Sequence, residues 1–265
     1  MNRELLQYTL QLADNALILG HRNSEWCGHG PVLEQDIAIS NIALDLIGQA
    51  RNCYQYAALI LNDDPSLLPE QKWKDIHGIV TEDSLAYFRD AHDFRNNILV
   101  EQPKGDWAVT ILRQFFFSLF QELLFEKLKD CKDEQLAAIA VKSLKEIAYH
   151  LRWSSEWVIR LGDGTGESKE RITRAITELW PYTNEMFVPA SYETALITNT
   201  LVPDVRSLQE KWTRQVEEIF EAATISIPLV HGIQTNGKEG IHTHHLDTLL
   251  NALQSVARSQ PEATW

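Results

Sequence analysis

The sequence has few of the residues that interrupt helices. It contains 12 glycines and 9 prolines among 265 residues, and none of them lies between Asp106 and Leu161. β-branched residues do not alternate with polar ones over any long stretch, whereas apolar residues recur with a period near 3.6. These absences argue against strands and predict an all-α chain.

The sequence also lacks an excess of positive charge. It has 24 Lys and Arg against 37 Asp and Glu, for a net charge of −13. Nucleic acids and anionic membrane surfaces need clustered cations, so we expect neither as a partner. The longest stretch without Asp, Glu, Lys or Arg, Ala222–Gly237, contains Pro228 and Gly232 and is too short to span a bilayer.

Cysteine is scarce as well. Three cysteines form no C-x-x-C pair, which predicts reduced thiols rather than a disulfide framework. The N-terminal segment soon reaches Asp14 and does not resemble a signal peptide. We therefore expect a cytoplasmic protein. The role of Cys27, close to His29, stays open at this stage.

Long segments free of helix breakers predict about seven long helices and a short one at the C-terminal end. They are expected over residues 4–19, 32–62, 82–100, 107–131, 134–161, 169–187, 208–223 and 244–258. Asp106 is a candidate N-cap for the fourth of them. Since no linker stands out, we expect a single domain over residues 1–265, built as a ferritin-like bundle of long antiparallel helices with additional helices.

Some polar residues fall on the apolar stripes of three predicted helices. Asp45 lies on a stripe of the second, Ser118 and Glu122 interrupt an aromatic seam of the fourth, and His150 is expected on the inner face of the fifth. A buried carboxylate must be paired or coordinated. The alternative is that the Asp45 stripe faces solvent and that His150 is an ordinary hydrogen-bonded core residue.

Inward carboxylates and a histidine raise the possibility of a di-iron site, which needs a Glu-x-x-His motif on each of two helices. The only Glu-x-x-His is Glu239-Gly-Ile-His242, in a predicted loop. The long helices hold two incomplete versions, Asp45-x-x-Gly48 and Ile147-x-x-His150. Glu146 is one residue out of register and is expected to point elsewhere. The alternative is coincidence in a Glu-rich helical protein.

Five motifs in order resemble the PaaC-type subunit family of the ring-1,2-phenylacetyl-CoA epoxidases, the phenylacetic acid degradation proteins. The resemblance covers residues 8–265. The motifs are Glu25-Trp-Cys-Gly-His29, Asp45-Leu-Ile-Gly-Gln-Ala-Arg51, Leu99-Val-Glu-Gln-Pro103, Glu146-Ile-Ala-Tyr-His-Leu-Arg152 and Gly240-Ile-His-Thr-His-His-Leu246.

The resemblance implies a ferritin-like subunit that is not itself catalytic and has no cofactor of its own. In such complexes a related catalytic subunit binds the di-iron centre and the CoA thioester. A small accessory subunit and a reductase with flavin and iron–sulfur cofactors complete the assembly. The reaction inserts one oxygen atom into the aromatic ring of phenylacetyl-CoA to give the 1,2-epoxide.

The resemblance also implies that a di-iron site has been lost from this chain. The expected remnants are Asp45, Gly48, Ser118, Gln121, Glu122, Ile147 and His150. Catalytic relatives place Glu-x-x-His where this chain has Asp45-x-x-Gly48 and Ile147-x-x-His150. With the metal gone, Asp45 and His150 need partners inside the bundle, and a contact between them, or with Arg51 or Arg152, is expected.

The C-terminal motif departs from the family, which has His-Thr-Glu-His where this chain has His242-Thr-His-His245. His242, His244 and His245 are thus candidates for binding adventitious metal together with Glu239. The alternative is an ordered loop that packs on the bundle or on a partner.

Two other functions compete with the structural subunit: an independent ferritin-like di-iron oxidase or iron-binding protein, and a generic helical interaction protein. The isolated chain is also a candidate homodimer. Aromatic residues are enriched at interfaces, which makes several of the eight tryptophans candidates for packing between subunits. These are Trp26, Trp107, Trp153, Trp157 and Trp180.

Overall fold

The computed structural model describes residues 2–69, 73–75, 77–228 and 232–263, and its regular elements are helices. The longer ones are α1 (Asn2–Ser24), α2 (Leu33–Asp63), α5 (Trp107–Leu128), α6 (Glu134–Gly162), α7 (Gly166–Leu179), α9 (Gln209–Ala222) and α10 (His244–Ser259). Shorter ones are α3 (Glu82–Tyr87), α4 (Ile98–Glu101) and α8 (Ser191–Thr198). The predicted all-α class is confirmed.

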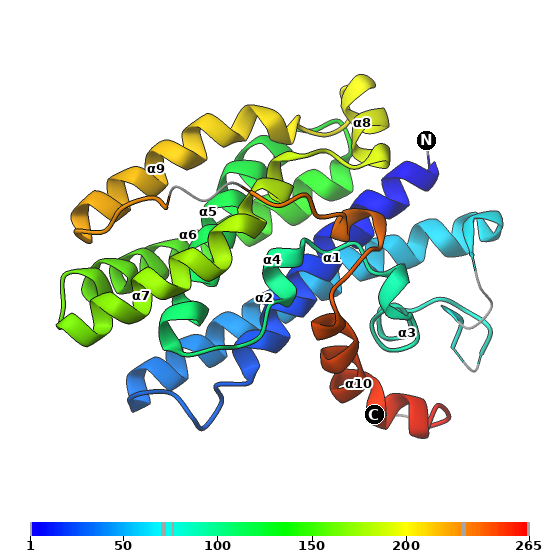
Figure 1. Cartoon of the computed structure of the whole chain (residues 1–265). Helices are drawn as coiled ribbons and strands as arrows, with labels where there is room; N and C mark the ends of the chain where they lie inside the picture. The colour runs from blue at the N-terminus through cyan, green and yellow to red at the C-terminus, as the bar shows by residue number, and fades with distance from the viewer. Residues whose placement is uncertain (1, 70–72, 76, 229–231, 264–265) are drawn as a thin grey trace.

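Two helical hairpins form the bundle. α1 packs along α2, α5 packs along α6, and α2 meets α6 where the hairpins come together. Helices α7 and α9 cover α5 and α6, whereas α10 lies beside α3 at the other side of the molecule (Figure 1). This arrangement agrees with the predicted ferritin-like bundle.

Aspartate N-caps set the starts of the two central helices. The Asp106 carboxylate accepts the backbone N–H of Val109 at 3.1 Å, and that of Asp133 accepts the N–H of Leu136 at 2.9 Å. Each cap satisfies one of the backbone donors that a helix leaves unpaired at its first turn. The predicted cap at Asp106 is confirmed.

Helix α5 is apolar enough, and long enough, to cross a membrane by composition alone. The window that passes this test is 94% buried inside the chain. Its side chains include Phe115, Phe116 and Phe120, all of them in the hydrophobic core. The apolar character of α5 is therefore used by the bundle core.

The prediction of one continuous helix over residues 82–100 is wrong. The chain forms α3, a 3-10 turn at Ala91–Asp93 and α4 instead. Between these elements Arg89 turns into the core, where its Nε donates to the Leu85 carbonyl at 2.6 Å and Nη1 donates to the Asp93 carbonyl at 3.1 Å. A continuous helix would not bring both carbonyls to one guanidinium.

Arg89 forms a fully buried ion pair with Asp14 of α1. Tyr54 of α2 donates its hydroxyl to Asp14 at 2.5 Å, and the Arg95 backbone N–H donates to the same carboxylate at 2.8 Å. Burial alone would lower the pKa of Arg89, but the neighbouring Asp14 raises it, so the guanidinium stays charged. The pair ties α1, α2 and the segment before α4 together.

Removing one partner of this pair should leave an uncompensated buried charge. We expect Arg89→Met to lower the free energy of unfolding by about 3–5 kcal/mol. Arg214→Met is the matched control, because Arg214 pairs with Glu210 on the surface of α9 and is 64% exposed. Urea unfolding of both variants measures the difference, and equal effects would contradict the assigned role of the buried pair.

Candidate functional site

The expected site residues come from three helices. Asp45 and Gly48 lie on α2, Ser118, Gln121 and Glu122 on α5, and Ile147 and His150 on α6. The structure brings some of them together and separates others.

Asp45 and His150 meet across α2 and α6. His150 Nε2 lies 3.1 Å from Asp45 Oδ2; the His150 side chain is fully buried, and that of Asp45 is 35% exposed. Burial lowers the pKa of His150, although Asp45 opposes that shift. A neutral imidazole that donates from Nε2 leaves Nδ1 as an acceptor, and this atom has no partner among the described residues. The predicted contact is confirmed.

The Glu146 side chain points toward α2, contrary to the expectation that it would point away from the other site residues. Its carboxylate accepts a hydrogen bond from Gln49 Nε2 at 2.9 Å, and Gln121 Nε2 donates to Gln49 Oε1 at the same distance. Glu146 lies one turn before His150 on α6, and residues four apart share a helix face. Gln49, which sequence reasoning missed, is buried in this group.

The two contacts across α2 and α6 are related by an internal repeat. Asp45-Leu-Ile-Gly-Gln-Ala-Arg51 matches Glu146-Ile-Ala-Tyr-His-Leu-Arg152 in its acid, aliphatic, polar and arginine positions. The acid of each segment contacts the polar residue of the other, so Asp45 reaches His150 and Glu146 reaches Gln49. The likeness of these two segments is the sequence signal that could have identified Gln49.

This repeat corrects the register expected for α2. Leu46 corresponds to Ile147 and Gln49 to His150, and all four side chains are buried. Gly48, by contrast, is exposed, and a Cβ placed on it would meet nothing within 4 Å. The inward positions are therefore 46 and 49, one residue beyond the expected Asp45-x-x-Gly48.

The stripe of α2 that contains Asp45 mostly faces outward, as the alternative interpretation held. Ile37, Leu44 and Ile47 flank it and are 51%, 66% and 40% exposed. Asp45 reaches His150 from the edge of this face. The expectation of an apolar, buried environment for the stripe is wrong.

The expected site residues on α5 differ in their burial and in their contacts. Ser118 is buried and accepts a hydrogen bond from Gln114 Nε2 at 2.8 Å, and Gln114 Oε1 accepts one from Asn23 Nδ2 at 2.7 Å. Glu122 is only half-buried; burial and then Glu126 raise its pKa. Glu122 therefore stands apart from the contacts between α2 and α6.

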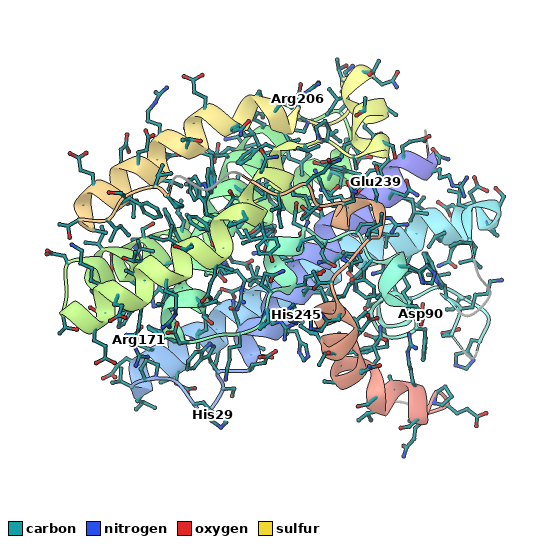
Figure 2. The ribbon with its side chains drawn as sticks, in the orientation of Figure 1. His29, Asp90, Arg171, Arg206, Glu239 and His245 are labelled. Atoms are coloured by element: carbon teal, nitrogen blue, oxygen red, sulfur yellow. The ribbon has the colours of Figure 1, made fainter. Side chains whose placement is uncertain are left out.

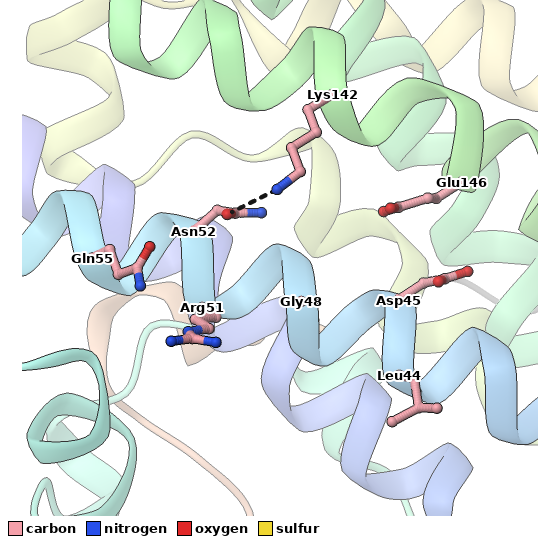
Figure 3. Close-up of a pocket in the computed structure, with 8 residues that line it drawn as sticks. All are labelled: Leu44, Asp45, Gly48, Arg51, Asn52, Gln55, Lys142 and Glu146. Carbon is pink, nitrogen blue, oxygen red and sulfur yellow. Dashed lines mark hydrogen bonds between the residues drawn. The ribbon is translucent and has the colours of Figure 1, made fainter.

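A hollow of about 350 Å³ lies over the exposed side of these contacts, between α2 and α6 (Figure 3). Asp45 and Glu146 line one end of it, and Lys142 and Asn52 lie further along, with the Lys142 ammonium 3.3 Å from Asn52 Oδ1. The hollow is charged rather than apolar, unlike a typical small-molecule site.

The histidines of the C-terminal motif do not gather around Glu239. Both ring nitrogens of His242 are engaged, Nδ1 at 2.7 Å from Glu101 Oε2 and Nε2 at 3.0 Å from the Phe94 carbonyl. Glu239 accepts the Ser191 backbone N–H at 2.6 Å, and Figure 2 shows it well apart from His245. The rings of His244 and His245 lie against each other, with centroids 3.9 Å apart and planes tilted by 45°. These contacts agree with an ordered loop packed on the bundle.

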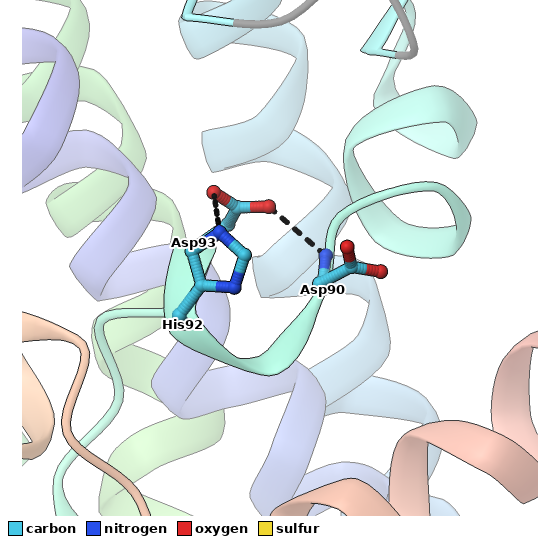
Figure 4. A group of neighbouring side chains, drawn as sticks. All are labelled: Asp90, His92 and Asp93. Carbon is cyan, nitrogen blue, oxygen red and sulfur yellow. Dashed lines mark hydrogen bonds and ion pairs between the residues drawn. The ribbon is translucent and has the colours of Figure 1, made fainter.

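Within the described part of the chain, one group of three metal-capable side chains converges, namely Asp90, His92 and Asp93 (Figure 4). Asp93 Oδ2 accepts the Asp90 backbone N–H at 3.0 Å, and Asp90 Oδ1 accepts a hydrogen bond from Arg258 at 3.0 Å. His92 lies 3.4 Å from Asp93 and is 65% exposed. These contacts close the turn after α3 and anchor α10.

The five tryptophans that the sequence offered as interface candidates contact other aromatic rings within the chain. The ring of Trp107 makes edge-on contacts with those of Trp26, Trp153 and Trp157, with centroids 5.0–5.9 Å apart. Trp180 packs on Phe116 and Trp212. These contacts lie within the chain, and a role of the five residues between subunits stays a prediction.

Cys27 is exposed in the turn between α1 and α2. His29 directs its Nδ1 to the Cys27 carbonyl at 3.0 Å rather than to the thiol. The imidazole therefore does not face the thiol, as it would in a Cys–His pair in which the histidine activates the cysteine as a nucleophile.

The depressed pKa of His150 predicts a pH-dependent stability. Below about pH 6.5 the unfolded chain takes up a proton at His150 more readily than the folded chain does, because burial lowers the pKa of His150 in the fold. The stabilisation is therefore present above the unfolded pKa and is lost as the pH falls. His150→Gln, which copies Gln49, should lose less stability between about pH 7.5 and pH 5 than the wild type does. Urea unfolding at both pH values checks this, and identical losses would refute it.

Comparison with known proteins identifies the family of the chain. The sequence model of the family described as phenylacetic acid catabolic protein, PaaA_PaaC, matches residues 1–265. A protein of Escherichia coli strain K12, named as one of the subunits of 1,2-phenylacetyl-CoA epoxidase, is 41% identical over 262 residues, which cover 99% of each chain. The chain belongs to the phenylacetic acid catabolic protein family.

Proposed function

We propose that the chain is a non-catalytic structural subunit of a multicomponent phenylacetyl-CoA 1,2-epoxidase in aerobic phenylacetate catabolism. It pairs with a di-iron catalytic subunit and a small accessory subunit of the same complex. Support comes from the relative that is named as a subunit of such an epoxidase. The observation that carries the proposal is the set of side chains at the four inward positions of the repeat: Leu46, Gln49, Ile147 and His150.

These side chains do not fit a di-iron centre. Such a centre takes a Glu-x-x-His from each of two helices and a Glu from each of two others. Leu46 and Ile147 offer no ligand atom, and Gln49 is hydrogen-bonded on both sides of its amide. Ser118 and Gln121 of α5 supply only a neutral hydroxyl and a neutral amide. We therefore assign no step of oxygen chemistry to this chain and expect the di-iron centre in its partner.

The compartment is part of the same proposal. Cys27, Cys53 and Cys131 are all free, and burial raises the pKa of the Cys53 thiol to about 12. Unpaired thiols suit a reducing compartment, so we place the protein in the cytoplasm.

Iron analysis separates the proposal from the alternative of an independent di-iron oxidase or iron-binding protein. The chain purified alone should hold far less than one iron, and co-expression with the catalytic subunit should yield a stable complex whose iron is contributed by that subunit. Roughly two irons per isolated chain, with an oxo-bridged absorption band, would overturn the proposal. So would failure of the two chains to co-purify.

Reconstruction tests whether the repeat marks a lost site. The triple variant Leu46→Glu, Gln49→His, Ile147→Glu places Glu-x-x-His on both helices. We expect it to bind Co²⁺ with a ligand-field spectrum and to melt at a higher temperature when Co²⁺ is present, because binding to the folded state stabilises it.

The matched control replaces Gln49→His by Gly48→His, which puts the second histidine in the outward register. We expect the control to show no rise in melting temperature with Co²⁺. If both triple variants respond alike, positions 46 and 49 are not the lost ligand positions.

A further inference from the structure

A smaller cavity, of about 140 Å³, lies at the end of the bundle where α1 begins and α2 ends, near the N-terminus in Figure 1. One wall is the start of α1, where Leu6 and Leu10 lie four residues apart on one helix face. Leu67 and Trp73, from the segment after α2, form another wall. An apolar cavity of about 150 Å³ can hold one benzene ring, so this one has room for an apolar group of about that size.

The ring of Trp73 is held in place, yet its indole N–H has no acceptor. The Trp73 carbonyl accepts the Ser84 hydroxyl at 2.7 Å, and the guanidinium carbon of Arg89 lies 5.7 Å from the ring centroid. Trp73 is only 4% exposed, and its Nε1 has no hydrogen-bond partner among the described residues. Because a buried tryptophan N–H usually has an acceptor, we expect one inside the cavity that this residue lines.

Two arginines that line the cavity have no acidic partner. Arg3 is exposed at the start of α1, Arg95 is partly buried, and neither forms an ion pair with a described residue. Arg95 donates from Nη1 to the backbone carbonyls of His92 and Phe94, so its other two nitrogens have no acceptor among the described residues. In a chain with a net charge of −13, two such arginines at one cavity favour an anion.

One acid, Asp93, also lines the cavity, but it takes part in the neighbouring turn. Its Oδ2 accepts the Asp90 backbone N–H at 3.0 Å, and its Oδ1 lies 3.4 Å from His92 Nε2. Two arginines against one aspartate leave an excess of positive charge among the described residues that line the cavity. This polar edge suits a carboxylate, whose two oxygens match the donor fork of an arginine.

We propose that this cavity binds a small organic carboxylate. The apolar body of the ligand packs on the leucines of α1 and on the Trp73 ring, its carboxylate lies between the two arginines, and one of its oxygens accepts the Trp73 N–H. An inorganic anion would leave the apolar walls unfilled, and a neutral arene would leave the arginines unpaired. The inference does not depend on the proposed function, because none of these residues takes part in the contacts between α2 and α6.

NMR of the indole N–H groups tests where the ligand binds. Titration of the isotope-labelled full chain with phenylacetate, at constant ionic strength, should shift the Trp73 signal until one ligand is bound per chain, and Trp73→Phe assigns that signal. Trp107 is the internal control, because its Nε1 is also buried without a partner but the residue does not line the cavity. The absence of a saturable shift, or equal shifts of both signals, would overturn the proposal.

A ligand series separates the carboxylate from the apolar body. In calorimetry, phenylethyl alcohol, which has the ring without the charge, and acetate, which has the charge without the ring, should each bind at least about tenfold more weakly than phenylacetate. Inorganic phosphate at the same concentration should not displace phenylacetate. Equal affinity of the alcohol would show that the arginines do not recognise the ligand. Equal affinity of acetate or phosphate would show that the cavity takes any anion, and either result would contradict the proposal.

Variants test the residues that are assigned to the ligand. Arg3→Gln should weaken phenylacetate binding by about three- to fivefold, because Arg3 is exposed and solvent screens its charge. Arg152→Gln is the matched control, since Arg152 is exposed on α6 and also forms no ion pair with a described residue. Trp73→Phe keeps a ring but removes the donor, and should weaken binding by about tenfold. Circular dichroism confirms that the variants fold, and equal affinities of the Arg3→Gln and Arg152→Gln proteins would contradict the assignment.

Discussion

The buried ion pair of Asp14 and Arg89 is the contact on which the less regular part of the bundle depends. The carboxylate belongs to α1, the guanidinium to the segment after α3, and Tyr54 of α2 donates to the same carboxylate. The Arg89 carbonyl also accepts hydrogen bonds from Gln254 and Arg258 of α10. One charged contact thus positions segments that are distant in sequence. It can do so only because both charges are paired inside the low-dielectric core.

The requirement that buried charges be paired also explains how the C-terminal loop is held. Glu101 accepts hydrogen bonds from His242, from Thr243 and from Asn96, and Glu193 pairs with the buried Lys238. Glu185 accepts the backbone N–H groups of Ile98 and Gly237, and burial raises its pKa. The net charge of −13 gives no hint of these buried carboxylates, because composition does not reveal which charges have a buried donor.

Periodicity and capping were sufficient to predict the long helices, since helix breakers, Asp106 and the apolar period are local signals. The break between α3 and α4 was not predictable in this way, because it follows from the distant partner of Arg89. The register of α2 was missed for a related reason. Periodicity places Asp45 and Gly48 near the inner face, yet a one-residue shift is 100° of rotation, and only the contacts with α6 fix it.

The one-residue shift in register changes the interpretation of Gly48. In the expected register its missing side chain is a lost ligand, whereas in the observed register Gln49 holds the inward position and Gly48 belongs to the outer face. The inner face of α2 is then filled by Leu46 and by the amide of Gln49, which donates to the Glu146 carboxylate of α6 and accepts from Gln121 of α5. The outer face keeps its carboxylates half-exposed and its backbone open at one point. The buried position of Gln49 and the exposed position of Gly48 thus both follow from the register of one heptapeptide on α2.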